Sequence, residues 1–208
     1  MKKYFLAGCL FFCFTSFCFA YWQKRLQLRW QHLYHYDLRQ DKHQLYNNRI
    51  SFIFSYMDKH EKTLFKIEPF FEFRRNINKD ITERKELGIE IGKDIFTWFY
   101  IGEVIQQVWM NEDYRYYTDY EKRDFTNSET RLLFKHSLLN KDKFKLEGFI
   151  LEEYTFDFNR QKGLCNEVAI GFIVPLGKHL QVNLNWRHID RIHYYDSDTF
   201  ETSLTLFY

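Results

Sequence analysis

The chain has 208 residues, of which 28% are charged and 21% aromatic, and its formal net charge is only +2. This near-neutral balance gives no electrostatic reason to expect a nucleic acid as partner. A soluble domain would have to bury this many aromatic rings, whereas a barrel in a membrane can turn them toward lipid. The composition therefore favours a membrane-embedded protein.

Residues 1–20 have the features of a cleaved secretory signal peptide. A basic start precedes an almost wholly apolar segment, and a small-x-small cleavage site ends at Ala20. A retained anchor helix is one alternative. Lipidation at Cys9 is another, but the apolar segment continues well beyond this cysteine. We expect export across the inner membrane and a mature chain, 21–208, that forms a single barrel domain.

Three of the four cysteines fall within the expected signal peptide, which leaves Cys165 alone in the mature chain. No intramolecular disulfide is then possible, so stability has to come from another source. No later segment has the roughly 18 consecutive apolar residues of a transmembrane helix. A closed, hydrogen-bonded barrel in lipid is stable without a disulfide and crosses the membrane without a helix. Cys165 is then expected to be a small filler of its interior.

Apolar and polar residues begin to alternate directly after the expected cleavage site. In 22–38, tryptophan, leucine and tyrosine dominate one face, whereas arginine, glutamine and histidine dominate the other. This segment is much longer than the 5 or 6 residues usual for strands of globular sheets. Its polar face is too highly charged for a soluble core, which favours a strand that crosses a membrane.

The same two-faced pattern recurs along the whole chain, as expected for membrane-spanning strands of roughly 9 to 11 residues joined by turns. Pro69 is an irregularity, because proline cannot donate to a ladder, and it predicts a bulge. Strands are expected at 22–38, 45–57, 63–75, 81–91, 95–110, 126–138, 144–156, 164–174, 180–192 and 199–208.

The fifth of these strands has apolar residues on both faces between residues 96 and 101. Glu103 and Gln107 then indicate the inner face. The predicted outer face of this strand consists of Phe96, Trp98, Tyr100, Val104 and Val108.

The last strand alternates cleanly and ends on an aromatic residue. Its predicted outer face includes Phe200, Leu204, Leu206 and Tyr208. This ending resembles the C-terminal strand of bacterial outer-membrane β-barrels, which pairs with the first strand and closes the sheet. The resemblance implies insertion by the barrel-insertion machinery.

These patterns predict an all-β fold, a transmembrane antiparallel up-and-down β-barrel of about ten strands, with eight to twelve possible. An even number of strands brings both termini to the periplasmic side. The expected connections are short on that side, and the longest, 111–125, lies on the other. We expect a monomer in outer-membrane lipid.

A soluble, lipocalin-like barrel with the apolar face turned inward is the main alternative fold. Large aromatics on nearly every strand would overfill a small interior, whereas charges of both signs on the polar face can neutralise one another there. The charges predicted to form a ladder inside the lumen are Arg25, Arg29, Glu68, Glu72, Arg74, Arg84, Glu86, Glu90, Glu103, Glu129, Arg131, Lys135, Glu147 and Arg187.

This ladder could line a narrow passive channel, or it could be a plug of ion pairs in a structural or surface-interaction protein. We expect no catalytic residue, no cofactor and no metal. The alternative from another class is an outer-membrane hydrolase, although no histidine is followed two positions later by serine. Its site would combine loop acids and histidines: His188, Asp190, His193, Asp196 and Asp198, or Glu112, Asp113, Asp119 and Glu121.

The mature chain resembles an uncharacterised DUF-type family of small bacterial outer-membrane β-barrels in three stretches, 30–39, 127–135 and 183–188. The resemblance implies the fold and an outer-membrane location. It carries no catalytic residues, so it implies no activity.

Overall fold

The computed structural model describes residues 23–38, 44–58, 62–78, 80–111, 124–141, 144–192 and 196–208. The predicted signal peptide lies outside these residues. Within them, no helix is long and apolar enough to cross a membrane. The strands are β1 (Gln23–Asp37), β2 (Gln44–Met57), β3 (Thr63–Asn76), β4 (Ile81–Phe96), β5 (Phe99–Met110), β6 (Phe125–Lys141), β7 (Phe144–Asp157), β8 (Lys162–Leu176), β9 (Leu180–Arg191) and β10 (Ser197–Phe207).

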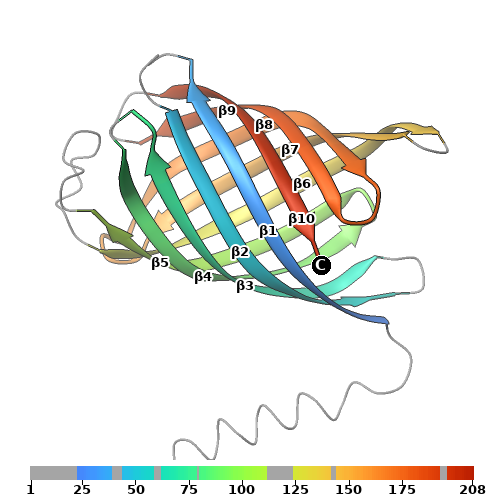
Figure 1. Ribbon diagram of the computed structural model, residues 1–208. Coiled ribbons are helices and arrows are strands. Elements are labelled where there is room, and N and C mark those ends of the chain that lie inside the picture. Colours follow the sequence, from blue (N-terminus) through green and yellow to red (C-terminus); the bar gives the residue numbers. More distant parts are fainter. Residues whose placement is uncertain are drawn as a thin grey trace, which may run out of the picture.

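The ten strands form one closed antiparallel barrel in which each strand pairs with its neighbours in sequence (Figure 1). β10 pairs with β1 from Arg29↔Phe207 to Asp37↔Thr199 and so closes the sheet. The predicted fold class and the strand count are confirmed. Because every strand has two partners, the barrel has no open edge that would leave backbone groups unpaired in lipid.

β1 begins and β10 ends at the same end of the barrel, which we call the terminus end. Connections at this end are short, with 97–98 and 142–143 as two-residue examples. The opposite end, which we call the loop end, has the long connection 111–124 between β5 and β6. The predicted asymmetry of short and long connections is therefore present.

The two faces of the barrel are inverted relative to those of a soluble protein. Outward side chains of β2, such as Phe52 and Phe54, are about half exposed, whereas Ser51 on the opposite face is fully buried. Buried polar and charged residues outnumber buried apolar ones among the described residues, and they project into the lumen. The lipocalin-like alternative is therefore wrong, because the apolar face is the outer one.

The sequence-based boundary between the fourth and fifth strands is wrong. β4 continues to Phe96, and the turn lies at 97–98 instead of 92–94. The pairing of β4 with β5 shifts register between Asp94 and Phe96, so that Asp94 pairs with Tyr100. This irregularity moves every later residue of β5 to the face opposite to the predicted one.

As a result, the predicted faces of β5 are inverted. Tyr100, Val104 and Val108 are buried in the lumen, with Val104 at 0% exposure, and Gln106 is buried on the same face. Glu103 lies on the outer face, which it shares with the exposed Ile105. Its assignment to the charge ladder is therefore wrong.

Pro69 lies inside β3 without the predicted bulge. The pairing of β2 with β3 keeps one register on both sides of it, from Ser51↔Phe70 to Phe54↔Ile67, but no pair is formed at Pro69 itself. On the other side, Pro69 pairs with Ile89 of β4. The missing N–H is thus accommodated by a local gap in the β2 ladder.

Small residues in β4 and β5 provide the space that Tyr100 occupies in the lumen. A Cβ atom at Gly92 would lie 2.0 Å from the Tyr100 hydroxyl oxygen and 2.8 Å from the carbonyl oxygen of Ile101. Gly92→Val is therefore expected to destabilise the barrel by roughly 1 to 3 kcal/mol through overpacking. The measurement is the urea midpoint of the folded form on gels. Tyr100→Ala should recover part of the loss, and equal midpoints for Gly92→Val and the native protein would contradict this packing.

Candidate functional site

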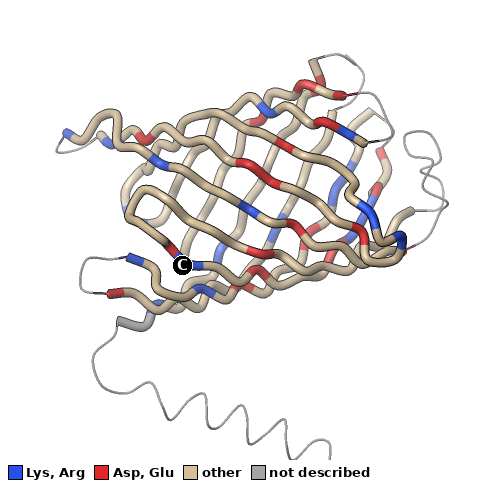
Figure 2. The backbone as a smooth tube through the Cα atoms, turned by 180° about the vertical axis from the view of Figure 1, so that it is seen from behind, with Lys and Arg blue, Asp and Glu red and all other residues tan. Residues whose placement is uncertain are grey.

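A cavity of about 1000 Å³ occupies the lumen. Its lining includes Lys62 and Asp94 near the terminus end and Asp37 and Arg191 near the loop end, so it extends along the barrel. Among the described residues, cationic and anionic side chains line it in nearly equal numbers, ten against eleven. Figure 2 shows that acidic and basic residues are interspersed over the barrel wall. The cavity is therefore a charged but nearly neutral environment.

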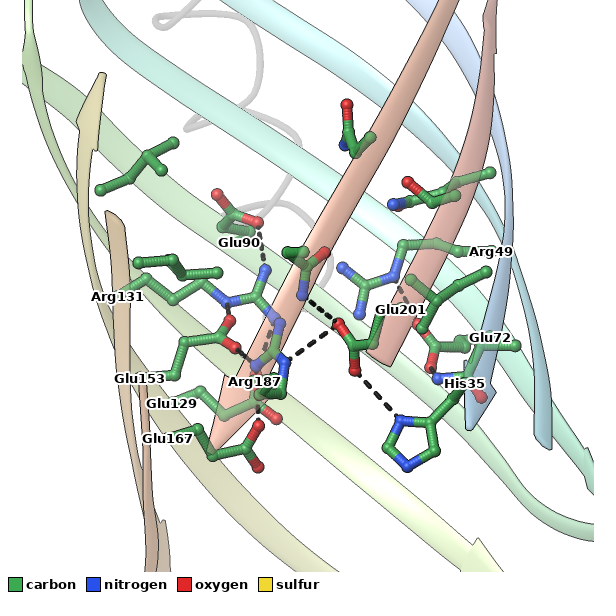
Figure 3. A pocket seen from close by; sticks show the side chains of 18 of the residues that line it. His35, Arg49, Glu72, Glu90, Glu129, Arg131, Glu153, Glu167, Arg187 and Glu201 are labelled. Carbon is green, nitrogen blue, oxygen red and sulfur yellow. Dashed lines mark hydrogen bonds and ion pairs between the residues drawn. The ribbon is translucent and has the colours of Figure 1, made fainter. Parts of the chain in front are cut away.

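A chain of ion pairs runs around the inside of the barrel and is drawn in part in Figure 3. We call it the ion-pair ring. It begins and ends on β1, and most of its members lie near the middle of their strands. Its members, in order, are Arg29, Glu68, Lys66, Glu90, Arg131, Glu153, Arg187, Glu201 and His35.

The two central arginines of the ring each bind more than one carboxylate. Arg131 contacts Glu90 at 3.0 Å and Glu153 at 2.7 Å, and also Glu129 at 2.8 Å. Arg187 is paired with Glu153 and lies 3.1 Å from Glu201. Glu153 therefore connects the two arginines, and both carboxylate oxygens are used.

The ring crosses three strands by means of small residues. Arg29, Arg131 and Arg187 each reach a glutamate two strands away. The residue paired with each arginine on the strand in between is Ser51, Gly102 and Ala169, respectively. Because these side chains are small, they leave room for a guanidinium group to pass over the intervening strand.

Tyr100 and Lys66 complete the ring next to β4. The Tyr100 hydroxyl donates to Glu90 Oε1 at 2.6 Å, and Lys66 Nζ binds the same carboxylate. Lys66 also lies 4.9 Å from the centroid of the Tyr100 ring. The inverted orientation of β5 therefore supplies a donor to the ring, because the predicted orientation would have pointed Tyr100 to lipid.

A second group of charges lies nearer the loop end of β2, β3 and β4. Arg49 Nε binds Glu72 Oε2 at 2.6 Å and its guanidinium lies 4.0 Å from the Phe70 ring centroid. Asn47 bridges Glu72 and Arg74, donating to the first at 3.1 Å and accepting from the second at 3.1 Å. Most of these side chains are largely buried, so their charges depend on one another for stabilisation.

The structure places most of the predicted ladder inside the lumen. Arg84 and Glu86 are paired there. Lys135 and Glu147 line the cavity near the terminus end, without an ion pair of their own among the described contacts. Arg25 is exposed at the mouth of the same end. The ladder residues in the ion-pair ring or its side contacts are Arg29, Glu68, Glu90, Glu129, Arg131 and Arg187.

Of the residues predicted for a hydrolase, the structure describes four and brings two of them together: these four are His188, Asp190, Asp196 and Asp198. His188 Nδ1 lies 2.8 Å from Asp198 Oδ1, on the outer face that β9 shares with the exposed Trp186. Asp190 lies on the same outer face and pairs with Asn166 of β8. His193, Glu112, Asp113, Asp119 and Glu121 lie outside the described residues. Within the part of the chain that the structure describes, no cluster of His, Cys, Asp or Glu could hold a metal ion.

The closing strand has the predicted orientation. Phe200, Leu204 and Tyr208 are exposed on the outer wall, and Tyr208 also exchanges backbone hydrogen bonds with Leu28 of β1. Leu206 pairs with Trp30 on the same face. A closed barrel with an apolar outer wall, a charged interior and no free sheet edge is a transmembrane β-barrel, the class of protein found in the outer membrane of bacteria.

No protein-family model and no curated protein matches the chain, so the family predicted from the sequence is not identified. Among solved structures, a bacterial polysaccharide outer membrane secretin is 10% identical, with a TM-score of 0.47, over 86% of this chain and 69% of that one. The β domain of the Bordetella autotransporter BrkA is 9% identical, with a TM-score of 0.47, over 88% and 98%. The NanC porin is 11% identical, with a TM-score of 0.38, over 88% and 99%. Likenesses this distant carry no inference about substrate or partner.

Several functional residues were not found by sequence reasoning. His35 was placed on the polar face but without a role, and its Nδ1 lies 3.1 Å from the acceptor Oε1 of Glu201. Tyr100 was placed on the wrong face. The small residues Ser51, Gly102 and Ala169 have no signal of their own, since their importance follows only from the register that pairs them with arginines.

Proposed function

We propose that the protein is a narrow passive channel of the outer membrane for ions and small hydrated solutes. The observation that carries this proposal is the cavity of about 1000 Å³, because its lining includes residues near both ends of the barrel. The ion-pair ring would be the constriction, since its side chains project inward from most strands at mid-height. Fixed charges at a constriction act on passing ions.

The channel should discriminate only weakly between cations and anions. Charges of the two signs line the cavity in nearly equal numbers, and those of the ring are paired with one another. Paired charges largely cancel at a distance, so a passing ion meets local dipoles instead of a field of one sign. Size should therefore limit passage more strongly than charge.

A structural barrel with a closed lumen is the second candidate. It is favoured by an apolar group inside the lumen, where Phe149, Ala169 and Ile173 are buried against one another and against Leu133 and Leu151. This packing narrows the cavity on the β6–β8 side. The two candidates differ in one observable, which is whether the folded barrel conducts.

We also propose that the protein has a non-enzymatic role. Its terminus end would lie in the periplasm, and the barrel-insertion machinery would insert it into the membrane. His188 is engaged with Asp198 on the outer wall, which supports a structural use of this histidine. The outward apolar face of β10, which closes the barrel against β1, supports the route of insertion.

The native Cys165 provides a test of the channel, because it lines the cavity and is the one free cysteine among the described residues. The purified barrel, in a planar lipid bilayer, is expected to give discrete conductance steps. An excess of a charged methanethiosulfonate reagent should lower these steps by adding bulk inside the lumen, whereas Cys165→Ser should not respond. A folded barrel that gives no conductance steps would contradict the channel and support the structural candidate.

A further inference from the structure

The outer wall of β5 carries a carboxylate at a depth where lipid is expected. Glu103 is the fifth residue of the twelve in β5 and shares its face with Ile105 and Trp109, which are 47% and 39% exposed. Trp98 and Trp109 mark the two ends of this strand on the outer wall. With about 3.4 Å per residue and a tilt of about 40°, Glu103 lies roughly 13 to 16 Å from the level of either tryptophan. Such a position is near the middle of the apolar band.

Glu103 belongs to a group of polar residues on the outer faces of β5 and β6. Thr130 Oγ1 donates to Glu103 Oε2 at 2.7 Å, and Thr126 Oγ1 donates to Gln107 Oε1 at 2.7 Å. Ser128 lies between the two threonines on the same face of β6 and pairs with Ile105. We call these five residues the polar seam. It consists of Glu103, Gln107, Thr126, Ser128 and Thr130.

Much of the remaining outer wall is apolar, although β7 exposes Glu152 on it. At comparable positions β2 exposes Ile50, Phe52 and Phe54, and β8 exposes Ile170 and Phe172. These are the side chains that lipid solvates well. The polar seam therefore gathers five polar side chains on two adjacent strands of a wall that is largely apolar at this depth.

Lipid tails cannot satisfy the polar seam. A carboxylate has about four positions that accept a hydrogen bond, and Thr130 supplies one donor to Glu103. Hydrocarbon supplies none, so ionisable groups at this depth normally face protein or water. The hydroxyl side chains of β6 are also small, and small residues allow two membrane segments to approach closely. Both properties are those of a protein interface.

We propose that the polar seam is the interface with a second copy of this chain, in the same orientation, about a two-fold axis that runs parallel to the barrel between β5 and β6. Such an axis places β5 of one copy opposite β6 of the other at matching depth. The acceptor Glu103 then faces the Ser128 hydroxyl of the other copy, while the Thr130 hydroxyl of its own copy continues to donate to it. The surface is thus self-complementary, as a two-fold interface requires.

A different partner would have to carry its own donors at this depth, whereas a second copy has them by symmetry. The proposal is independent of whether the lumen conducts. It replaces the expectation of a monomer.

The first test is cross-linking in native outer membranes, in a Cys165→Ser background. Ser128→Cys lies at the centre of the polar seam, and Ile170→Cys is the matched lipid-facing control at 50% exposure. A membrane-permeant bismaleimide is expected to give a species of twice the chain mass with Ser128→Cys but not with Ile170→Cys. Equal yields at both positions, no product at Ser128→Cys, or an adduct of another mass would each overturn the proposal.

The second test uses Glu103, because an interface and a lipid surface predict opposite effects of the same change. If the polar seam binds a second copy, Glu103→Leu removes hydrogen bonds to a charged group and should weaken dimerisation about tenfold or more. Glu103→Gln, which keeps hydrogen-bonding capacity, should weaken it less. The measurement is the mass in mild detergent by analytical ultracentrifugation. A native protein of monomer mass, or a Glu103→Leu barrel that is more stable and unchanged in mass, would overturn the proposal.

Discussion

Arg187→Leu is expected to lower the stability of the barrel by roughly 3 to 5 kcal/mol, because it removes one partner from several buried ion pairs. Arg187 binds Glu153, Glu167 and Glu201, and its side chain is only 15% exposed. Without the guanidinium, these carboxylates would repel one another in a confined space. The measurement is the urea concentration at which the folded, faster-migrating form disappears from unboiled gel samples.

Arg75→Leu is the matched control for this experiment. Arg75 is paired with Asp80 outside the lumen, where the two side chains are 50% and 82% exposed. Solvent-exposed pairs contribute about 1 kcal/mol or less, so this variant should stay close to the native midpoint. Similar losses for Arg187→Leu and Arg75→Leu would show that the ion-pair ring does not stabilise the barrel.

Leu204→Pro is expected to prevent formation of the closed barrel. Leu204 pairs with His32 of β1 and with Val182 of β9, so it lies inside the ladder that closes the sheet. Proline lacks the N–H group and would leave a carbonyl group without its donor at membrane depth, a loss of roughly 3 kcal/mol or more. The expected result is the absence of any heat-modifiable form in the outer-membrane fraction.

Leu204→Ala separates the backbone effect from the side-chain effect. It keeps the N–H group and removes only apolar surface that faces lipid, since Leu204 is 37% exposed. This variant should still give the heat-modifiable form. Native-like mobility of Leu204→Pro would contradict the closure of the barrel through β1 and β10.

Most of the architecture could be predicted from the alternation of residues alone. In nine of the ten strands, a face rich in aromatic and aliphatic residues opposes one that is polar and charged, so the period of two is unambiguous. β2 illustrates this period: because side chains alternate between the two faces, Phe52 and Phe54 can face lipid only if Ser51 faces the lumen. The pairing of β10 with β1 followed from the terminal aromatic strand and the requirement for closure.

β5 could not be predicted in the same way. Near its start both faces are apolar, so the alternation carries no information about which face is the inner one. The register is set instead by the irregularity between Asp94 and Phe96 and by the space that Gly92 and Gly102 leave for Tyr100. A shift of one residue in register turns every side chain of the strand to the opposite face. Glu103, predicted to face the lumen, therefore lies on the outer wall.

The sequence by itself determined the all-β class, the number of strands, the polar lumen and the closing strand, because these depend on a local period and on the absence of free edges in lipid. Only the tertiary structure decided how the lumen charges are partnered. The connections from Arg131 to Glu90 and from Arg187 to Glu153 each cross an intervening strand. They exist because the register places Gly102 and Ala169 beside the arginines. Register is a property of neighbouring strands together, so it cannot be read from any one strand.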